Sequence, residues 1–376
     1  MHVYLDNAAT TILDPIVLDA MMPFFKEHFG NPSSIHTHGR EAKSAIEKAR
    51  KTVASLLNTS PSEIFFTSGG TEADNTAITS SIKAFNIKHA ITSPIEHHAV
   101  LHTLEHLEKE GRIQLHYVKL NEKGEINYDD LEHLLHNHNN CFVSLMHGNN
   151  EIGNLSDIVR IGELCRKYGA IYHSDTVQTA GHFPHDLQKL KVDFIVGSAH
   201  KFHGPKGVGF LYVNGDRKID PLIYGGAQER NMRGGTENIY GIVGLAKALE
   251  LAYQNMASHK EHISKLKAHM INSLKAEIPG VNFNGASADP ECSLYTVLSV
   301  SLPPSDMNEM LLFNLDINKI SASAGSACAS GTDAGSHVLN AIKADPERGH
   351  IRFSFSKYNT IEEVNYTIKK LSNFYK

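Results

Sequence analysis

Short apolar runs alternate with amphipathic stretches between about residue 60 and residue 215. The runs are rich in β-branched and aromatic residues, which predict strands, and most of the intervening stretches have helical periodicity. This alternation is typical of an α/β domain with a largely parallel sheet. The predicted strands are Ile64–Thr67, His89–Thr92, Leu115–Val118, Phe142–Leu145, Ala170–His173, Phe194–Val196 and Val208–Val213.

Two local signals refine this pattern. A helix is expected from Ser156 to Tyr168, with Ser156 as its N-cap and Gly169 just past its end. Only a turn rich in glycine and proline separates the last two predicted strands, so we expect them to pair as an edge of the sheet.

A second, smaller domain follows a long helical stretch. The helical pattern runs from Asn238 to about Glu277 and stops at Pro279-Gly280. Beyond it, the segments 295–300 and 351–355 are predicted strands. We therefore assign residues 15–256 to a large α/β domain. We expect the first dozen residues to pack with the C-terminal part of the chain, so residues 1–14 and 257–376 together form a small α+β domain.

Charge and hydropathy exclude several classes of protein. Lys and Arg total 36 and Asp and Glu total 41, a net charge of −5, so no broad basic surface favours nucleic acid or an anionic membrane. No apolar run reaches eighteen residues, and the N-terminus lacks the pattern of a signal peptide, so we expect a cytoplasmic protein without a membrane span. The 24 histidines make isolated histidine matches weak evidence.

The four cysteines do not form a metal or disulfide pattern. They lie at positions 141, 165, 292 and 328, and none forms a Cys-x-x-Cys pair. So few cysteines fit a reducing compartment. Cys328 differs from the others because its Gly/Ser/Ala-rich segment, residues 321–336, offers little apolar surface to bury a thiol. It is either an exposed redox liability or a nucleophile whose thiolate a nearby group stabilises.

Lys201 directly follows a predicted strand, in Ser198-Ala199-His200-Lys201. A lysine buried there is costly unless it is paired or covalently used, for instance as a Schiff base with the aldehyde of pyridoxal phosphate (PLP). A lysine after a strand is more often a solvated surface residue, so both interpretations remain open at this point.

Other polar groups follow predicted strands of the same sheet. The turn at Gly70 and Thr71 leads from a strand into a helix, where free amides and the helix dipole favour a phosphate. Asp175 ends another strand and could keep a pyridine nitrogen protonated, and His97 could stack on a planar ring and move protons. A plain turn or a helix-capping aspartate would use the same residues. His102 and His106 have a spacing that metals use, but we interpret them as a solvated helix face and expect no metal site.

Ordered motifs cover nearly the whole chain and together closely resemble the cysteine desulfurases, a family of PLP enzymes in the fold type I aminotransferase superfamily. Any one motif is weak, but their number and order are specific. They are Tyr4-Leu5-Asp6-Asn7-Ala8-Ala9-Thr10-Thr11, Gly30-Asn31-Pro32-Ser33-Ser34, Phe66-Thr67-Ser68-Gly69-Gly70-Thr71-Glu72, Glu96-His97, Met146-His147-Gly148-Asn149-Asn150-Glu151-Ile152-Gly153, Ser198-Ala199-His200-Lys201, Arg233-Gly234-Gly235-Thr236-Glu237-Asn238, Ser323-Ala324-Gly325-Ser326-Ala327-Cys328 and Ile351-Arg352-Phe353-Ser354.

The resemblance implies a large domain with a mainly parallel sheet, a smaller C-terminal domain, PLP as the cofactor and L-cysteine as the substrate. It implies that Lys201 holds the cofactor as a Schiff base and moves a proton, that Cys328 accepts the sulfur as a persulfide, and that His97 stacks on the ring and acts in proton transfer. The other implied positions are Asp175 at the pyridine nitrogen, Gln178 at the phenolic oxygen, Gly70, Thr71, Ser198 and His200 at the phosphate, Thr236 at the phosphate from a second subunit, and Asn150 and Arg352 at the substrate carboxylate.

The resemblance also implies partners: a second copy of the chain in a homodimer, and a sulfur-acceptor protein such as an iron–sulfur scaffold, or a tRNA-thiolation pathway. Three positions depart from the commoner family pattern without removing a required chemical group. Gly70 stands in place of alanine and Ala227 in place of glycine, and the segment Asn154-Leu155-Ser156-Asp157-Ile158 lacks the usual glutamine before its Asp-Ile pair. The alternatives are a selenocysteine lyase, another fold type I PLP enzyme, or a non-catalytic PLP-binding homologue.

Overall fold

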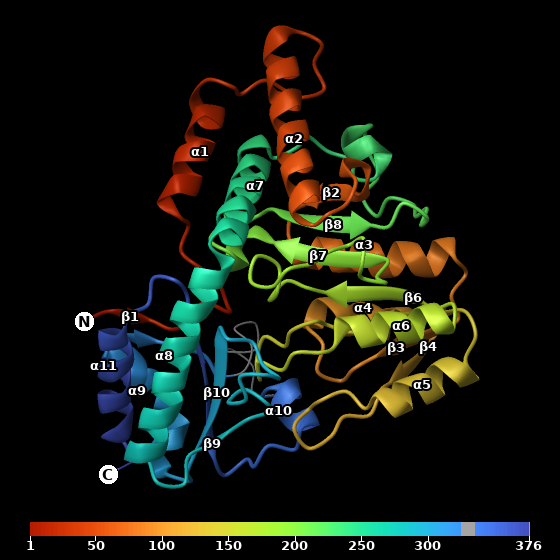
Figure 1. Ribbon diagram of the computed structural model, residues 1–376. Helices are drawn as coiled ribbons and strands as arrows, with labels where there is room; N and C mark the ends of the chain where they lie inside the picture. The colour runs from red at the N-terminus through yellow and green to blue at the C-terminus, as the bar shows by residue number, and fades with distance from the viewer. Residues whose placement is uncertain (325–334, 376) are drawn as a thin grey trace.

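The computed structural model describes residues 1–324 and 335–375. Its centre is a seven-stranded sheet with the strand order β2-β8-β7-β6-β5-β3-β4 (Figure 1). Strands β3 to β7 run parallel to one another, and β8 is antiparallel to both of its neighbours. The strands are β2 (Ile64–Thr67), β3 (His89–Thr92), β4 (Gln114–Tyr117), β5 (Cys141–Ser144), β6 (Ile171–Asp175), β7 (Phe194–Ser198) and β8 (Gly209–Val213).

Helices cover both faces of this sheet. The strands alternate their side chains, so that Val143 of β5 joins one apolar cluster while Phe142 joins the other. The first cluster includes residues of α1 (Pro15–Lys26), α2 (Thr37–Leu56), α5 (Tyr128–Asn137), α6 (Ile158–Lys167) and α7 (Ile239–Gln254). The second includes α3 (Gly70–Ala84) and α4 (His98–Lys109).

A separate apolar core lies beside the N- and C-termini. It is built on the antiparallel strands β9 (Asn282–Phe283), β10 (Val297–Leu302) and β12 (Gly349–Ser354), and on the parallel pair β1 (Val3–Tyr4) and β11 (Ile320–Ser321). The helices of this core are α8 (Met256–Glu277), α9 (Leu311–Ile317) and α11 (Ile361–Ser372), whereas Val338 of α10 (His337–Ala341) packs in a smaller cluster with Ile95 and Ile152. The expected packing of the first residues with the C-terminal part is confirmed, because β1 pairs with β11.

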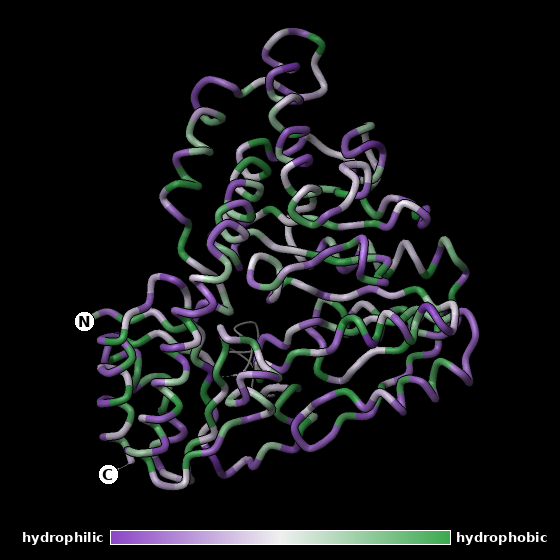
Figure 2. Tube along the Cα trace, viewed as in Figure 1, coloured by the Kyte–Doolittle hydropathy of each residue, from purple (hydrophilic) through white to green (hydrophobic). Residues whose placement is uncertain are grey.

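Amphipathic helices carry much of this packing. Along the outer helices, hydrophobic and hydrophilic positions alternate, so one side of each helix can face a core (Figure 2). Among the described residues, no helix is both long and apolar enough to cross a membrane.

The predicted strands are confirmed to within two residues at each end. Three local expectations are wrong. Asp157, not Ser156, caps α6, because its side chain accepts from the amides of Val159 and Arg160. Strands β7 and β8 do pair, but β8 lies inside the sheet, since β2 forms the edge beside it. The helical stretch 238–277 is broken at Asn255 into α7 and α8.

Candidate active site

A cavity of about 220 Å³ lies at the carboxyl ends of the parallel strands, where ligands bind in open α/β sheets. Segments that are far apart in the sequence line it, from residue 8 to residue 352. Sequence-predicted residues make up most of the lining. They are Gly70, Thr71, His97, Asn150, Asp175, Gln178, Ser198, His200, Lys201 and Arg352.

Two predicted residues are not in that lining. Cys328 lies outside the described residues. Thr236 is exposed in the loop between the 3₁₀ turn Gln228–Asn231 and α7. Its position does not contradict the expectation that it serves the site of a second subunit.

Lys201 follows β7 at the end of a 3₁₀ turn that spans Ala199–Lys201. Its Nζ donates to the carbonyl oxygens of Ala8 at 2.6 Å and Ala9 at 2.8 Å. The N-terminal segment therefore holds the amine at the cavity wall. Motif spacing gave no role to Ala8 and Ala9, because they contribute only backbone atoms.

Asp175 is the last residue of β6, and its Oδ1 accepts from the amide of Val177 at 2.8 Å. Burial raises the pKa of this carboxyl to about 6, while the Val177 amide and the Lys201 charge partly oppose that rise. A cationic group beside Asp175 would stabilise the carboxylate. The site therefore suits a protonated ring nitrogen.

His97 is the N-cap of α4, and its Nδ1 accepts from the amide of Ala99 at 3.1 Å. Burial lowers the pKa of His97 to about 4, and the charges of Lys201 and His337 add to this effect. The ring is therefore neutral at pH 7. Because Nδ1 accepts, the proton of the neutral ring is assigned to Nε2, which can donate to a bound molecule.

The turn before α3 is shaped for an anion. Among the described residues, no side chain caps the first amides of α3, so these donors remain for a ligand. A Cβ on Gly209 would lie 2.5 Å from the Gly197 oxygen and 2.8 Å from the backbone of Gly69, so β8 can approach this turn only as glycine. Ser198 and His200 line the same cavity.

Gly70 departs from the commoner alanine, and the structure gives a steric reason. A Cβ on Gly70 would lie 2.7 Å from Cγ2 of Val177, a residue that also lines the cavity. The missing methyl group at position 70 thus makes room for the valine at position 177.

Arg352 of β12 is buried and reaches the cavity from the C-terminal part of the chain. Its Nη1 donates to the backbone oxygen of Asn150 at 2.9 Å, and its Nη2 donates to Oδ1 of Asp6 at 2.7 Å. Each Nη carries a second N–H, so a carboxylate can still be bound. Within the described residues, the buried Nε has no hydrogen-bond partner.

Gln178 also contacts the N-terminal segment, because its Nε2 donates to the Ala8 oxygen at 3.1 Å. His200 lies 3.1 Å from Thr10, between Nδ1 and Oγ1. Residues 8–10 thus contact three predicted site residues at once, including Lys201. The sequence motif contained these residues, but only the tertiary structure assigns them a role.

Two buried carboxyl groups near the site had no predicted role. Asp74 lines the cavity, and its Oδ1 lies 3.3 Å from Nε2 of His173. Burial, with the nearby carboxylates of Asp175 and Glu96, holds the pKa of Asp74 well above its usual range. Burial likewise raises the pKa of Glu96 to about 8. Helical spacing could have indicated Asp74, because it lies one turn after Gly70.

Comparison with known proteins identifies the family. Residues 3–367 match the family described as aminotransferase class-V. "Cysteine desulfurase IscS" of Clostridium botulinum is 44% identical over 379 residues, which cover 100% of this chain and 94% of the relative. A solved structure of a "NifS-like protein" has a TM-score of 0.91 and 39% identity, covering 99% of each chain. Another, "SspA in complex with cysteine", has a TM-score of 0.82 and 30% identity, covering 95% of this chain and all of that one.

These likenesses confirm the fold class and the resemblance inferred from the motifs. They are consistent with the mostly parallel sheet and with the position of the cavity at its carboxyl edge. Because the match extends over nearly the whole chain, the protein belongs to the aminotransferase class-V family.

Proposed function

We propose that this chain is a PLP-dependent cysteine desulfurase. It takes the sulfur of L-cysteine, releases L-alanine and leaves a persulfide on Cys328. The observation that carries the proposal is the convergence of Lys201, Asp175, His97 and Arg352 on one cavity at the carboxyl edge of the sheet. Curated relatives named cysteine desulfurase and a solved relative in complex with cysteine support the same reaction and substrate.

The cavity is chemically suited to PLP. The uncapped start of α3, with Thr71, Ser198 and His200, would hold the phosphate, and Asp175 would hold the ring nitrogen. Lys201 is the amine for the covalent link, and Gln178 is assigned to the phenolic oxygen. When bound, PLP supplies an electron sink that stabilises negative charge developing at the substrate α-carbon.

The residues of the chain would orient the substrate and move its protons. Arg352 would bind the substrate carboxylate through its remaining N–H groups, beside Asn150. Lys201 is assigned to proton transfer at the α-carbon. Neutral His97 lines the cavity, where it would stack on the cofactor ring, and is assigned to proton transfer when the C–S bond breaks.

The sulfur step balances without an external oxidant or reductant. The Cys328 thiolate attacks the substrate sulfur, the substrate C–S bond breaks, and a new S–S bond forms. The electron pair of the broken bond stays on the carbon that becomes the methyl group of alanine, which takes up a proton. The enzyme keeps one sulfur atom as the Cys328 persulfide.

The assignment of Cys328 as the sulfur acceptor is supported by described residues before and after it in the sequence, which form hydrogen bonds with residues at or beside the cavity. Before it, Ser323 and Arg352 exchange backbone hydrogen bonds of 3.2 and 2.6 Å. After it, Ser336 Oγ donates to Oε2 of Glu151 at 2.5 Å, and Nε2 of His337 lies 2.9 Å from the backbone oxygen of Glu96. Cys328 lies five residues from Ser323, a span of at most about 18 Å.

We also propose a homodimer in which Thr236 contributes to the phosphate site of the partner. Exposed apolar side chains support an interface around α1 and the segment that leads to α2, since Ile35 is 91% exposed and Phe29 is 68% exposed. Phe25 and Tyr240 stack at 4.1 Å in the same region. The cytoplasmic location, the division at residues 14/15 and 256/257, and a sulfur-acceptor protein of iron–sulfur assembly or tRNA thiolation stay predictions.

The decisive experiment is mass spectrometry of the holoenzyme after addition of L-cysteine. One extra sulfur atom is expected on Cys328, and none on Cys141, Cys165 or Cys292. Cys328→Ser should keep the coloured cofactor adduct and lose sulfide release under reducing conditions. Unchanged sulfide release in that variant would overturn the role of Cys328.

Two further measurements separate the alternatives. Borohydride reduction should attach the cofactor to a peptide containing Lys201, and Lys201→Ala should remove this link. Comparing L-selenocysteine with L-cysteine tests the selenocysteine-lyase alternative, which requires that only the selenium substrate turns over. Cofactor binding without turnover of either substrate would favour a non-catalytic homologue.

A further inference from the structure

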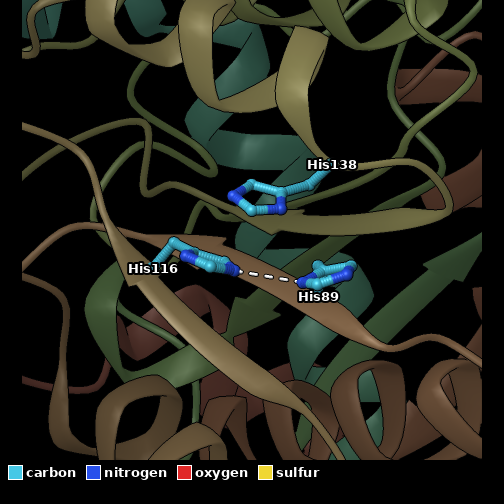
Figure 3. A group of neighbouring side chains, drawn as sticks. All are labelled: His89, His116 and His138. Atoms are coloured by element: carbon cyan, nitrogen blue, oxygen red, sulfur yellow. Dashed lines mark hydrogen bonds between the residues drawn. The ribbon is translucent and has the colours of Figure 1, made fainter.

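Three histidines from separate segments lie close together (Figure 3). His89 is the first residue of β3, His116 lies in β4, and His138 follows α5 just before β5. One ring nitrogen from each lies within 4.8 Å of the others. Their separations in sequence hide the cluster, because it arises only when β4 and β5 pair on either side of β3.

The rings are close and only partly buried. Nδ1 of His89 and Nε2 of His116 are 3.2 Å apart. The His138 ring stacks on both, with centroid distances of 4.1 Å to His116 and 4.6 Å to His89. All three side chains have intermediate exposure, so an ion from solvent can reach them.

His89 and His116 have the nitrogen separation of two ligands at a tetrahedral metal site. Zn–N bonds of about 2.05 Å place two ligand nitrogens about 3.3 Å apart, close to the His89–His116 separation. The His138 ring stacks on this pair, with one nitrogen within 4.8 Å of the other two, so the ring would have to turn to aim that nitrogen at the same centre. Three imidazoles leave one position for water.

A carboxylate lies next to the cluster. A histidine ring that has lost its proton offers a lone pair to a metal ion. The Glu108 carboxylate, which accepts from the Leu115 amide at 2.9 Å, adds negative charge next to His116.

We propose that His89, His116 and His138 form a binding site for a borderline divalent transition-metal ion of the Zn²⁺ class. The site is separate from the PLP cavity, because it lies where β3 and β5 begin rather than where they end. Among the strands that the structure describes, β4 is an edge strand of the sheet and pairs with β3 alone. A bound ion would therefore join this edge strand and the α5–β5 connection to β3, and stabilise the fold.

The test uses the holoenzyme carrying Cys328→Ser, so that this thiol cannot bind the ion. After treatment with chelator, Zn²⁺ is titrated by calorimetry. One ion per chain is expected, with at least tenfold weaker binding in His116→Gln and in His138→Asn. His136→Gln, an exposed histidine on α5 close to the cluster, is the matched control and should bind as the parent does.

Zinc X-ray absorption gives an independent readout. A first shell of nitrogen and oxygen at about 2.0–2.1 Å is expected, whereas a sulfur shell at about 2.3 Å would point to the remaining cysteines. Zn²⁺ should also raise the melting temperature of the parent and of His136→Gln, but not that of His116→Gln. Equal affinity in the parent and both cluster variants, or no bound ion in the parent, would overturn the proposal and leave His89 and His116 as a hydrogen-bonded pair. Turnover of L-cysteine in metal-free enzyme tests the proposed function separately.

Discussion

Ser323 and Arg352 exchange both of their backbone hydrogen bonds, at 3.2 and 2.6 Å, and share the carboxylate of Asp6. The Oδ1 of Asp6 accepts from Ser323 Oγ at 2.8 Å and from Arg352 Nη2 at 2.7 Å. One acidic side chain from the N-terminal segment thus fixes the arginine assigned to the substrate. The same carboxylate also holds Ser323, which precedes Cys328 by five residues in the sequence.

Asp6→Ala should weaken substrate binding, because Arg352 loses its orienting partner. A charge-assisted hydrogen bond contributes about 1.5–3 kcal/mol, so we expect KM for L-cysteine to rise about tenfold or more. Asp6→Asn keeps an acceptor oxygen and should show a smaller rise. Steady-state sulfide release checks both. An unchanged KM in Asp6→Ala would show that Asn150 alone orients the arginine.

Gly70 and Val177 should be energetically coupled. Gly70→Ala places a methyl group 2.7 Å from Val177 Cγ2, and such overpacking costs about 1–3 kcal/mol. Val177→Ala removes the clashing atom, so the double variant should recover about 1 kcal/mol relative to the sum of the single variants. Urea unfolding and cofactor affinity measure the cycle. Additive effects would contradict the steric explanation.

Asp175→Asn should have opposite effects in the apoenzyme and the holoenzyme. The folded pKa of Asp175, about 6, lies above its ordinary value of 3.8, so wild-type stability is lost as the pH rises between these values. We therefore expect the apo variant to gain about 3 kcal/mol relative to wild type by pH 7, with no difference near pH 3.8. Denaturant unfolding at several pH values checks this expectation.

In the holoenzyme, the same substitution removes the charge assigned to the ring nitrogen. Cofactor retention should fall, and L-cysteine turnover should fall with it. Equal cofactor affinity in the variant and wild type would contradict the assignment of Asp175, whatever the result for the apoenzyme.

Glu229→Gln should be strongly destabilising. The Glu229 carboxylate accepts from Arg50 at 2.7 and 2.8 Å and from the Phe66 amide at 2.8 Å, and both charged side chains are buried. The substitution removes the buried counter-charge of the Arg50 guanidinium and leaves it the partly exposed carboxylate of Glu47, 3.1 Å from its Nε, so we expect a cost of about 3–5 kcal/mol. Glu47→Gln is the matched control, because Glu47 also contacts Arg50 but is 44% exposed. Its loss should cost at most about 1 kcal/mol, measured by chemical denaturation.

The sequence by itself determined the strands, the α/β class and most of the cavity lining. Alternating apolar runs predict strands because side chains on a strand face opposite ways, and parallel strands bring their carboxyl ends to one edge. Asp175 ends a strand, the Gly70 turn follows another, and Lys201 lies three residues after a third. Their proximity could therefore be inferred from local patterns, and the ordered motifs supplied their roles.

Only the tertiary structure decided which groups from distant segments touch one another. The carbonyl oxygens of Ala8 and Ala9 hold Lys201, and Asp6 joins Arg352 to Ser323, because the N-terminal segment lies between the two cores. The three histidines meet for a similar reason, since the strand order, and not their spacing, brings His89, His116 and His138 together. Such contacts depend on long-range packing, and hydrophobic periodicity carries no information about which backbone oxygen or ring nitrogen will lie opposite a given side chain.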